Sequence, residues 1–563
     1  MPQYKFVSKE LIDKGWSGDK KYCVTDEQGN RFLLRISPIE QYERKKSEYE
    51  LMSQVAELGV PMCRPLEFGI SDEGVYSVQT WIDGLDAEEV MSDFSDTEQY
   101  VYGLEAGRIL KKIHSIPAPE TLENWESRFN RKMDYKIQKY TECPLKYENG
   151  QAFIDYINEN RHLLKDRPQV YQHGDYHIGN MMIGNDKQLY IIDFNRNDFG
   201  DPWEEFNRIV WGAQKSPLFA SGMINGYFDN DVPMEFWRLL ALYISSNTLS
   251  SLPWAIPFGD GQVDVMVNQA KEVLDWYDNM RNPIPNWYFK GYYLQYIDGV
   301  PFKLKSEFDF SFLNKYGKVF KVFDDQDSGN ICFGTEKKSQ RYFIKFAGAP
   351  TGRYNGKNED AIAGMKATLP IYNDLQHKNL IELVEAKSIG GGFAMVFKWV
   401  YGNCMGRMYP AQHKKFMNLP LEDKLKVFDD VLSFFEYIVN RNYVAIDFYD
   451  GSIIYDAESK KTTICDIDLF RKQPCINDMG RMYGSSLFQS PEEFKLGAAI
   501  DEVTNVYTLG ATAFALFGEY NRTRDKWQLS DKLFEVATKA VSDDRSQRQQ
   551  SIRQFIDEWE GAI

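Results

Sequence analysis

The sequence predicts an α+β fold of two tandem bilobal domains, each with a small antiparallel β lobe followed by a larger helical lobe. In the first half, short alternating segments separated by turn residues precede long segments with helical spacing. The same order begins again after about Phe308, and 563 residues are too many for one such domain. Two prolines at 283 and 285 break the helical pattern. We therefore expect a first domain at 1–282, a linking and packing segment at 283–305, and a second domain at 306–563.

The small lobe of the first domain begins with a glycine-containing turn that includes Ser17 and Gly18. Strand-like segments follow at 21–25 and 31–36. Alternation along the second of these strands places its apolar side chains on one face and Arg35 on the other. This strand therefore presents one cation on the face opposite its apolar side chains, unless Arg35 is simply an exposed residue of an edge strand.

A helical segment at 43–58 carries two carboxylates, Glu48 and Glu50, that are candidates to pair with Arg35. The distance of each from the end of the helix favours Glu48, although charged residues on such helices are often only solvated. A strand at 76–81 follows, and beyond it helical spacing dominates. These elements complete the predicted small lobe and lead into the helical one.

The segment 170–194 contains the most specific pattern in the chain. Asp175 and Asn180 lie five residues apart, close enough to share one loop, and Asp193 ends the apolar run 189–192. Transfer of a phosphoryl group needs a carboxylate near the acceptor hydroxyl and oxygen ligands for Mg²⁺. Asp175 fits the first role, and Asn180 with Asp193 fits the second. The alternative, a polar turn between two buried strands, does not explain four polar residues at these offsets.

These residues, together with His173 and Gly174, resemble the catalytic and metal-binding motifs of the aminoglycoside phosphotransferase family. The resemblance implies a protein-kinase-like fold, ATP and Mg²⁺ as cofactors, and phosphorylation of a hydroxyl of a small molecule. It also implies that Asp175 is catalytic and that Asn180 and Asp193 bind the metal.

The same resemblance assigns nucleotide-binding roles to the small lobe. The turn with Ser17 and Gly18 becomes the cover over the phosphates, and the strand that leads from 76 to 81 ends in a hinge for adenine. Arg35 stands where the family normally has lysine, so it keeps the charge with a planar, bidentate head. Glu48 becomes the carboxylate that pairs with this cation.

The second half is similar to a serine/threonine protein kinase over about 250 residues, an ordinary domain size. Lys345 on the strand-like segment 341–347 is equivalent to Arg35, Asp447 matches the catalytic base, and Asp466 matches the metal-binding aspartate. Ser490, Pro491 and Glu492 resemble the end of an activation segment.

Several residues of the second half depart from the kinase pattern. Ser452 stands where the metal-binding asparagine is expected, and a serine hydroxyl is a weaker ligand for Mg²⁺. The helix position expected to hold glutamate falls at Thr368. This half therefore either transfers phosphate, or binds nucleotide or a partner without transferring it.

Composition narrows the remaining choices. A net charge of −16 and a pI of about 5.1 argue against nucleic acid as a general partner. The seven cysteines show no pair spaced for zinc, so reduced thiols are expected. No apolar run reaches 18 residues and the first ten residues lack a signal-peptide core, so we expect a cytoplasmic protein with no membrane partner.

Three hypotheses remain open. The leading one is an ATP- and Mg-dependent phosphotransferase that acts on a small hydroxylated acceptor, either aminoglycoside-like or another antibiotic or metabolite. The acidic, aromatic helices at 203–280 suit a cationic acceptor, although they are equally the ordinary surface of an acidic protein. The second is a protein kinase with a polypeptide substrate at the C-terminal domain. The third is a nucleotide-dependent sensor or scaffold in which the C-terminal half regulates without catalysis.

Overall fold

The computed structural model describes residues 5–13 and 18–563 and divides into two compact units between Gly291 and Tyr292. We call them the N-terminal and the C-terminal unit. The expected linking segment 283–305 is shared between them. Trp287 and Tyr288 pack against the core of the N-terminal unit, whereas β11 (Tyr293–Ile297) and β12 (Val300–Leu304) form a hairpin in the C-terminal unit.

The N-terminal unit begins with a five-stranded antiparallel sheet in the order β1-β2-β3-β5-β4. Its elements are β1 (Phe6–Leu11), β2 (Lys20–Asp26), β3 (Arg31–Ser37), β4 (Pro65–Ser71) and β5 (Gly74–Thr80). Helix α1 (Tyr42–Glu57) connects β3 to β4 and packs against β4 and β5. The apolar side chains of β3 join one buried cluster with those of β2 and β5, which confirms the predicted alternation.

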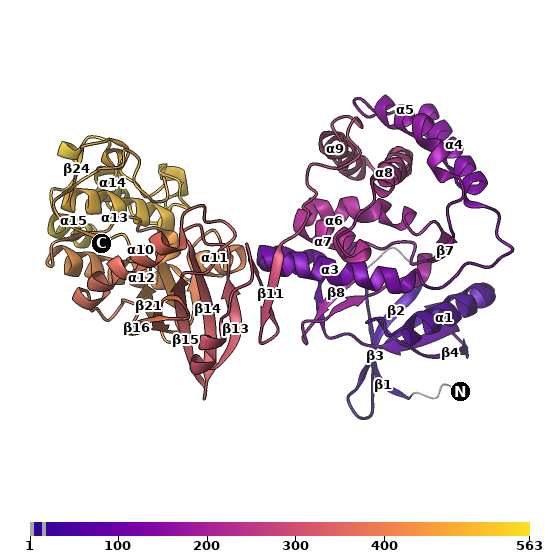
Figure 1. Ribbon diagram of the computed structural model, residues 1–563, viewed down its shortest axis with the longest axis horizontal. Helices are drawn as coiled ribbons and strands as arrows, with labels where there is room; N and C mark the ends of the chain where they lie inside the picture. The colour runs from indigo at the N-terminus through magenta and orange to yellow at the C-terminus, as the bar shows by residue number, and fades with distance from the viewer. Residues whose placement is uncertain (1–4, 14–17) are drawn as a thin grey trace. The chain divides into compact units, whose positions relative to one another are not determined.

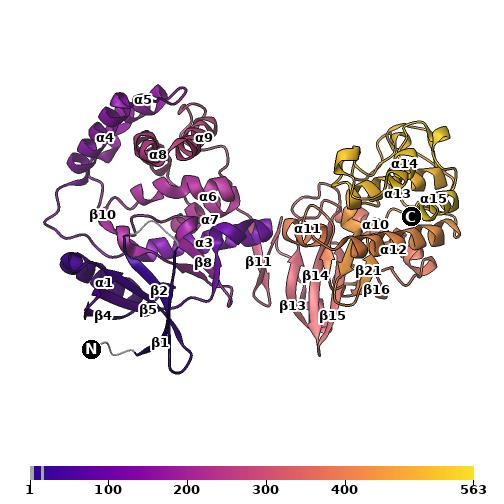
Figure 2. The same ribbon diagram turned by 180° about the vertical axis from the view of Figure 1, so that it is seen from behind.

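The rest of the N-terminal unit is mainly helical. Its helices are α2 (Ala87–Val90), α3 (Asp96–Ile113), α4 (Trp125–Glu142), α5 (Gln151–Asn160), α6 (Ile209–Lys215), α7 (Pro217–Phe228), α8 (Met234–Ala255) and α9 (Asp260–Trp276). Its short strands are β6 (Gly84–Asp86), β7 (Val170–Gln172), β8 (Met181–Gly184), β9 (Leu189–Ile191) and β10 (Asp198–Gly200). Figures 1 and 2 show the sheet and α1 at one end of this unit, α4, α5, α8 and α9 at the other, and α3, α6 and α7 between them.

Close packing of α3 against α7 supports the middle of this unit. A side chain at Gly103 of α3 would place its Cβ 2.1 Å from the carbonyl oxygen of Phe219, and one at Gly222 of α7 would lie 2.2 Å from that of Tyr100. Only glycine allows the two backbones to approach this closely. The Tyr176 hydroxyl, at the start of the loop that carries the candidate site, donates to the α3 carbonyl of Ala106 at 2.7 Å.

The C-terminal unit repeats the strand order of the first sheet. Strands β13 (Lys318–Phe323), β14 (Asn330–Lys337), β15 (Gln340–Ala347), β16 (Leu383–Ile389) and β17 (Gly392–Lys398) pair in the order β13-β14-β15-β17-β16. Helix α10 (Asn358–Asp374) connects the third strand to the fourth, as α1 does in the N-terminal unit. The two sheets thus share strand number, strand order and the position of the inserted helix.

A helical region follows this sheet. It contains α11 (Pro410–Met417), α12 (Leu421–Val439), α13 (Glu502–Phe517), α14 (Asp531–Ala540) and α15 (Ile552–Glu560). Its short strands are β18 (Asn403–Cys404), β19 (Tyr443–Val444), β20 (Ile453–Asp456), β21 (Lys461–Ile464), β22 (Arg471–Lys472), β23 (Cys475–Ile476) and β24 (Ala499–Ile500). Helix α13 is buried along most of its length and forms the centre of the larger apolar core.

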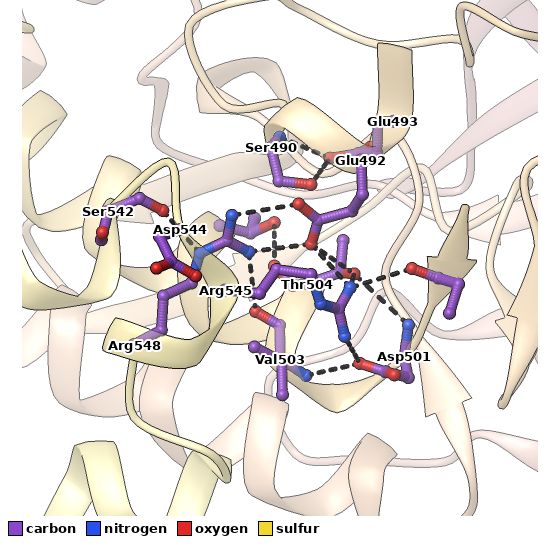
Figure 3. Close-up of polar contacts among 12 residues, drawn as sticks. Ser490, Glu492, Glu493, Asp501, Val503, Thr504, Ser542, Asp544, Arg545 and Arg548 are labelled. Atoms are coloured by element: carbon purple, nitrogen blue, oxygen red, sulfur yellow. Dashed lines mark hydrogen bonds and ion pairs between the residues drawn. The ribbon is translucent and has the colours of Figure 1, made fainter. Parts of the chain in front are cut away.

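A buried ion pair ties the segment before α13 to the C-terminal end of the chain (Figure 3). Arg548 donates two hydrogen bonds to the carboxylate of Glu492, at 2.8 and 3.0 Å, and its side chain is fully buried. Arg545 contacts the same carboxylate at 2.9 Å and also pairs with Asp501, which caps α13. Such a bidentate, charge-assisted pair fixes geometry as well as energy.

No helix in the described part of the chain is both long and apolar enough to cross a membrane.

Candidate active site

The loop between β7 and β8 holds the predicted catalytic residues of the N-terminal unit. The two ring nitrogens of His173 make different hydrogen bonds. Nδ1 accepts from the Asp175 backbone amide at 3.3 Å, so Nε2 carries the proton and donates it to the Ile192 carbonyl at 3.0 Å. Gly174 has a φ of +82°, and a Cβ there would lie 1.9 Å from the Arg196 carbonyl oxygen. His173 therefore joins the loop to the end of β9, and only glycine fits beside it.

Asp175 is surrounded by cations. Its carboxylate oxygens lie 3.5 Å from Arg208 Nε, 3.5 Å from Arg196 Nη1 and 3.7 Å from His177 Nε2. Burial alone would raise the pKa of Asp175, but His177, Arg208 and Arg196 together hold it well below its ordinary value. Asp175 is therefore ionised at neutral pH, and it is positioned to orient a hydroxyl and accept its proton.

Asn180 and Asp193 both approach this loop. The Asn180 amide nitrogen donates to the Asp175 carbonyl at 2.9 Å and to its carboxylate at 3.3 Å, while the Ile192 amide donates to the Asn180 carbonyl at 3.0 Å. Asp193 has a left-handed backbone, with φ of 66° and ψ of 59°. The structure therefore joins Asn180 to Asp175 and brings the residue before Asp193 into contact with the Asn180 backbone.

Asp193 also contacts the strand cation of the small lobe. Arg35 Nη1 lies 3.1 Å from Asp193 Oδ1, and Arg35 Nη2 lies 3.2 Å from Asp19 Oδ2. The Arg35 side chain is 11% exposed, so it remains at the edge of the cleft beside Asp193. Arg35 thus lies beside Asp193, a contact that the sequence analysis did not predict.

Glu48 does not pair with Arg35, which departs from the expectation. Instead Glu48 contacts Lys45 at 2.8 Å, and Lys45 contacts Asp19 at 3.0 Å, so that Asp19 occupies the position beside Arg35. Burial would raise the pKa of Asp19, but Arg35 and Lys45 together keep it below its ordinary value. A four-residue relay, Glu48, Lys45, Asp19 and Arg35, therefore connects α1 to Asp193.

The predicted phosphate cover is only partly described. Ser17 lies outside the described residues, and Gly18 is exposed, with open space around an added Cβ. Lys21 on β2 is paired with Arg35 in the strand register, which puts a second cation on the same face of the sheet. At the hinge, the Asp83 carbonyl accepts a hydrogen bond from the Asn185 amide at 2.8 Å.

Sequence reasoning missed several residues of this site. Arg196 follows the metal-binding aspartate by three positions, and Arg208 lies on the acidic segment that begins at residue 203. Glu205 is buried, and its carboxylate accepts a hydrogen bond from the Gly174 backbone amide at 2.9 Å. This hydrogen bond fixes the loop between β7 and β8. The three-residue spacing between Asp193 and Arg196 was a signal that could have identified Arg196. Arg208 gave no signal, because its role depends on tertiary contact.

In the C-terminal unit, Lys345 lies at the matching position on β15 and contacts Asp466 at 3.2 Å. It also pairs with Asp468, which accepts the Tyr372 hydroxyl of α10 at 2.8 Å. Thr368, the expected glutamate position, is buried and donates to the Met365 carbonyl of its own helix. Tyr372 and Asp468 therefore provide the connection between helix and strand cation that a glutamate would otherwise make.

The catalytic positions of the C-terminal unit are less favourable. Burial, with Asp466 nearby, raises the pKa of Asp447 to about 7, so this carboxyl is partly protonated at neutral pH. Ser452 is fully buried and its hydroxyl accepts the Tyr449 amide at 3.4 Å. The burial of Ser452 leaves its predicted role as a metal ligand a prediction.

Comparison with known proteins locates one family in the chain. Residues 10–238 match the family model described as the phosphotransferase enzyme family. This range lies in the N-terminal unit and includes Asp175, Asn180 and Asp193. The comparison with curated proteins found no match.

Several solved structures are similar to part of the chain. A choline/ethanolamine kinase family protein from Mesorhizobium loti shares 15% identity over 49% of this chain and 92% of its own, with a TM-score of 0.38. The GDP complex of an aminoglycoside phosphotransferase mutant shares 14% identity over 50% of this chain and 95% of its own, also with a TM-score of 0.38. A macrolide phosphotransferase from Brachybacterium faecium shares 13% identity over 47% of this chain and 94% of its own, with a TM-score of 0.36.

Proposed function

We propose that the N-terminal unit is a phosphotransferase that moves the γ-phosphoryl group of ATP to a hydroxyl of a small molecule. The observation that carries the proposal is the convergence of Asp175, Asn180 and Asp193, with Arg35 3.1 Å from Asp193. A base, two oxygen ligands and a phosphate-binding cation are what this chemistry requires. The family match over residues 10–238 supports the same reaction class.

The donor set fits a magnesium ion. Among the described residues, Asn180 Oδ1 and Asp193 Oδ2 make no hydrogen bond, because Asn180 turns its nitrogen toward Asp175 and Asp193 gives its other oxygen to Arg35. One or two protein oxygens, completed by water and phosphates, are the usual ligands of Mg²⁺. Asn180 and Asp193 would hold the ion, which would neutralise charge on the phosphates when bound.

The remaining steps, which are positioning the substrates and accepting the proton, belong to side chains of the protein. Asp175 orients the acceptor hydroxyl and takes its proton, and Arg35 binds phosphate oxygens from the side of the small lobe. His173 and Glu205 hold the loop in position through the Ile192 carbonyl and the Gly174 amide. Positioning of this kind accounts for a large part of the rate in phosphoryl transfer, since the transition state needs little covalent help.

We further propose that the C-terminal unit is a divergent protein-kinase-like domain that is weakly active or regulatory. Its strand order, the contact between Lys345 and Asp466, and the Glu492–Arg548 pair support the kinase-like assignment. The burial of Ser452, which stands where a metal-binding asparagine is expected, supports low activity. Regulation or binding of a protein partner are the roles left to such a domain.

The test of the main proposal is Asp175→Asn in the full-length protein. Turnover should fall by about 10²–10⁴-fold, because the base is lost, while nucleotide affinity should change little, because Arg35 and Asp193 remain. ADP release against a panel of hydroxylated compounds measures the first quantity and calorimetry measures the second.

The matched control is Asp186→Asn, which changes an exposed carboxylate in the turn between β8 and β9, where its partner is the Tyr190 hydroxyl. This variant should keep normal turnover. Near-normal turnover in Asp175→Asn would refute the catalytic role.

A further inference from the structure

Helix α4 places two lysines beside the candidate acceptor side of the site. Lys132 and Lys136 are four residues apart, so they share one face of the helix. Lys132 lies 3.4 Å from Glu204 Oε1, and the electrostatic neighbours of Lys136 are Lys132, Glu204 and Arg208. Like charges at this spacing repel one another on an isolated helix, so the arrangement needs an external reason.

These lysines continue the cations that surround Asp175. Arg208 connects Lys136 to Asp175, because it is an electrostatic neighbour of Lys136 and also contacts the Asp175 carboxylate at 3.5 Å. Arg196 approaches the same carboxylate from the other side at 3.5 Å and is half exposed. We call Lys132, Lys136, Arg196 and Arg208 the basic wall.

The nearby acids do not balance the basic wall. Glu204 is already held by Lys132 and by the Gln172 amide at 3.3 Å, and its pKa, which burial would raise, is kept below its ordinary value by Lys132, Lys136 and Arg208. Asp198 is occupied by Arg128 at 2.6 Å. Asp175 and Glu204 therefore face four basic side chains, which exceed these two carboxylates in charge when all four are protonated.

One of these cations has no acceptor. Among the described residues, Lys136 is half-buried and makes no hydrogen bond or ion pair, whereas Arg196 and Arg208 contact the Asp175 carboxylate at 3.5 Å. Burial and the neighbouring Lys132 lower the pKa of Lys136 to about 7. A half-buried ammonium without an acceptor is costly to keep charged, and a bound anion is the simplest group that would remove the cost.

On the basis of the proposed phosphotransferase function, we propose that the acceptor carries an anionic group, a carboxylate or a phosphate monoester, which Lys136 and Arg208 bind while its hydroxyl meets Asp175. A polyamine would add positive charge to the basic wall, whereas an anion compensates it. This narrows the acceptor to hydroxy acids and phosphorylated alcohols, in contrast to the cationic acceptor that acidic helices suggested from sequence.

The reaction balances with these groups in place. The acceptor hydroxyl oxygen forms a bond to the γ-phosphorus of ATP, and the bond from that phosphorus to the β,γ-bridging oxygen breaks. The electron pair of the broken bond leaves with ADP, and the hydroxyl proton passes to the Asp175 carboxylate. The anionic group of the acceptor takes no part in bond changes and only fixes the hydroxyl in line.

The test compares sets of small hydroxylated compounds that differ in one group: a neutral alcohol, its carboxylate, its phosphate ester and its amine. ADP release by the full-length protein gives kcat/KM for each. We expect the carboxylate or the phosphate ester to exceed both the neutral and the amino compound at least tenfold, and the two anionic arms to distinguish which group is preferred. A preference for amines would overturn the proposal.

Variants of Lys136 test the assigned residue. Lys136→Gln should raise KM for the anionic acceptor at least tenfold with little change in kcat, and Lys136→Arg should restore most of the affinity. Lys139→Gln is the matched control, because Lys139 lies on the same helix and is half exposed beside Glu142. An unchanged KM in Lys136→Gln, in a protein with normal unfolding behaviour, would contradict the assignment.

These experiments distinguish a failure of the proposed phosphotransferase function from a failure of the anionic acceptor alone. Lack of ATP binding and of turnover with every acceptor would overturn the phosphotransferase and the anionic acceptor together. Turnover with ATP that depends on Asp175 but favours neutral or amino acceptors would leave the phosphotransferase standing and overturn only the anionic acceptor.

Discussion

Gly174 sets the position of the catalytic carboxylate at the scale of a single residue. Its φ of +82° and the Arg196 carbonyl 1.9 Å from an added Cβ leave no room for a side chain, and the next residue is Asp175. A methyl group at this position must move the loop or the Arg196 backbone. Small displacements of a reacting group are costly, since a shift of about 1 Å can reduce turnover by about 10²-fold.

We therefore expect Gly174→Ala to lower turnover by about 10²-fold and the free energy of unfolding by about 1–3 kcal/mol. Steady-state ADP release and denaturant titration measure the two effects. Gly261→Ala is the control, because an added Cβ in this position of α9 has no atom within 4 Å. Wild-type turnover in Gly174→Ala would mean that the loop adapts without displacing Asp175.

Glu493 predicts a pH dependence of stability. Burial raises its pKa from 4.5 to about 7, although the amide and hydroxyl of Ser490 donate to the carboxylate. Between these two pH values the folded chain holds a proton that the unfolded chain has released, so the free energy of unfolding falls as pH rises through this window.

Glu493→Gln should remove this part of the pH dependence, because the amide stays neutral and its oxygen can still accept from Ser490. Above pH 7 the variant should be more stable than the wild type by up to about 3 kcal/mol, the equivalent of the pKa difference. Denaturant titrations at pH 5 and pH 8 measure the change. The prediction is wrong if the two proteins lose stability equally between these pH values.

At the scale of secondary-structure elements, one buried ion pair joins segments that are far apart in the chain. Glu492 and Arg548 join the segment before α13 to the segment before α15, and both side chains are almost completely buried. Arg545 adds a second guanidinium to the same carboxylate (Figure 3). Removing one partner of a buried pair leaves the other charge without compensation.

For this reason Glu492→Gln should lower the free energy of unfolding of the C-terminal unit by about 3–5 kcal/mol. Denaturant unfolding followed by tryptophan fluorescence measures the loss. Arg553→Ala provides a comparison, because Arg553 pairs with Glu436 and Asp557 on the surface and should matter little. Equal effects of the two substitutions would argue against a special role for the buried pair.

The elements themselves were largely predictable. The alternation of β3 and the strand Lys318–Phe323 agree with the sequence pattern, because a period of two residues is a local property. The loop residues Asp175 and Asn180 meet for the same reason, since they are five positions apart in the short loop between β7 and β8, which leaves few arrangements. Local spacing was therefore a sufficient guide to the centre of the candidate site.

Contacts between elements were not predictable in the same way. Lys45 and Glu48 are a local pair three residues apart on α1, but the contact of Lys45 with Asp19 joins two elements and depends on the fold. The replacement of a helix glutamate by Tyr372 and Asp468 likewise needs the three-dimensional position of α10 against the strand cation. Arg208 and Lys136 reach the site from elements far apart in the chain, so nothing in their local sequence identifies them.

At the scale of the whole molecule, the two units repeat one strand order but differ at the catalytic positions. The pKa of Asp175 is held low by three neighbouring cations, whereas that of Asp447 is raised to about 7 by burial and by Asp466. Because the family match and the contact between Asn180 and Asp175 both lie in the N-terminal unit, we propose that this unit carries the turnover.

Accordingly, Asp447→Asn should leave turnover of the full-length protein within about twofold of the wild type, in contrast to Asp175→Asn. The measurement is ADP release by both variants under the same conditions, with the preferred acceptor. A loss of tenfold or more in Asp447→Asn would assign part of the chemistry to the C-terminal unit and contradict the division proposed above.

The strand cations differ chemically between the two units, although they occupy equivalent places. Arg35 carries a planar guanidinium, whereas Lys345 carries a primary amine. Reagents that acylate amines, such as an acyl phosphate derivative of a nucleotide, can form an amide with Lys345 but not with Arg35. In the N-terminal unit such a reagent would have to react with another lysine, such as Lys21 beside Arg35 or Lys45 beside Asp19, so the modified peptide would identify which of the two units had bound the nucleotide.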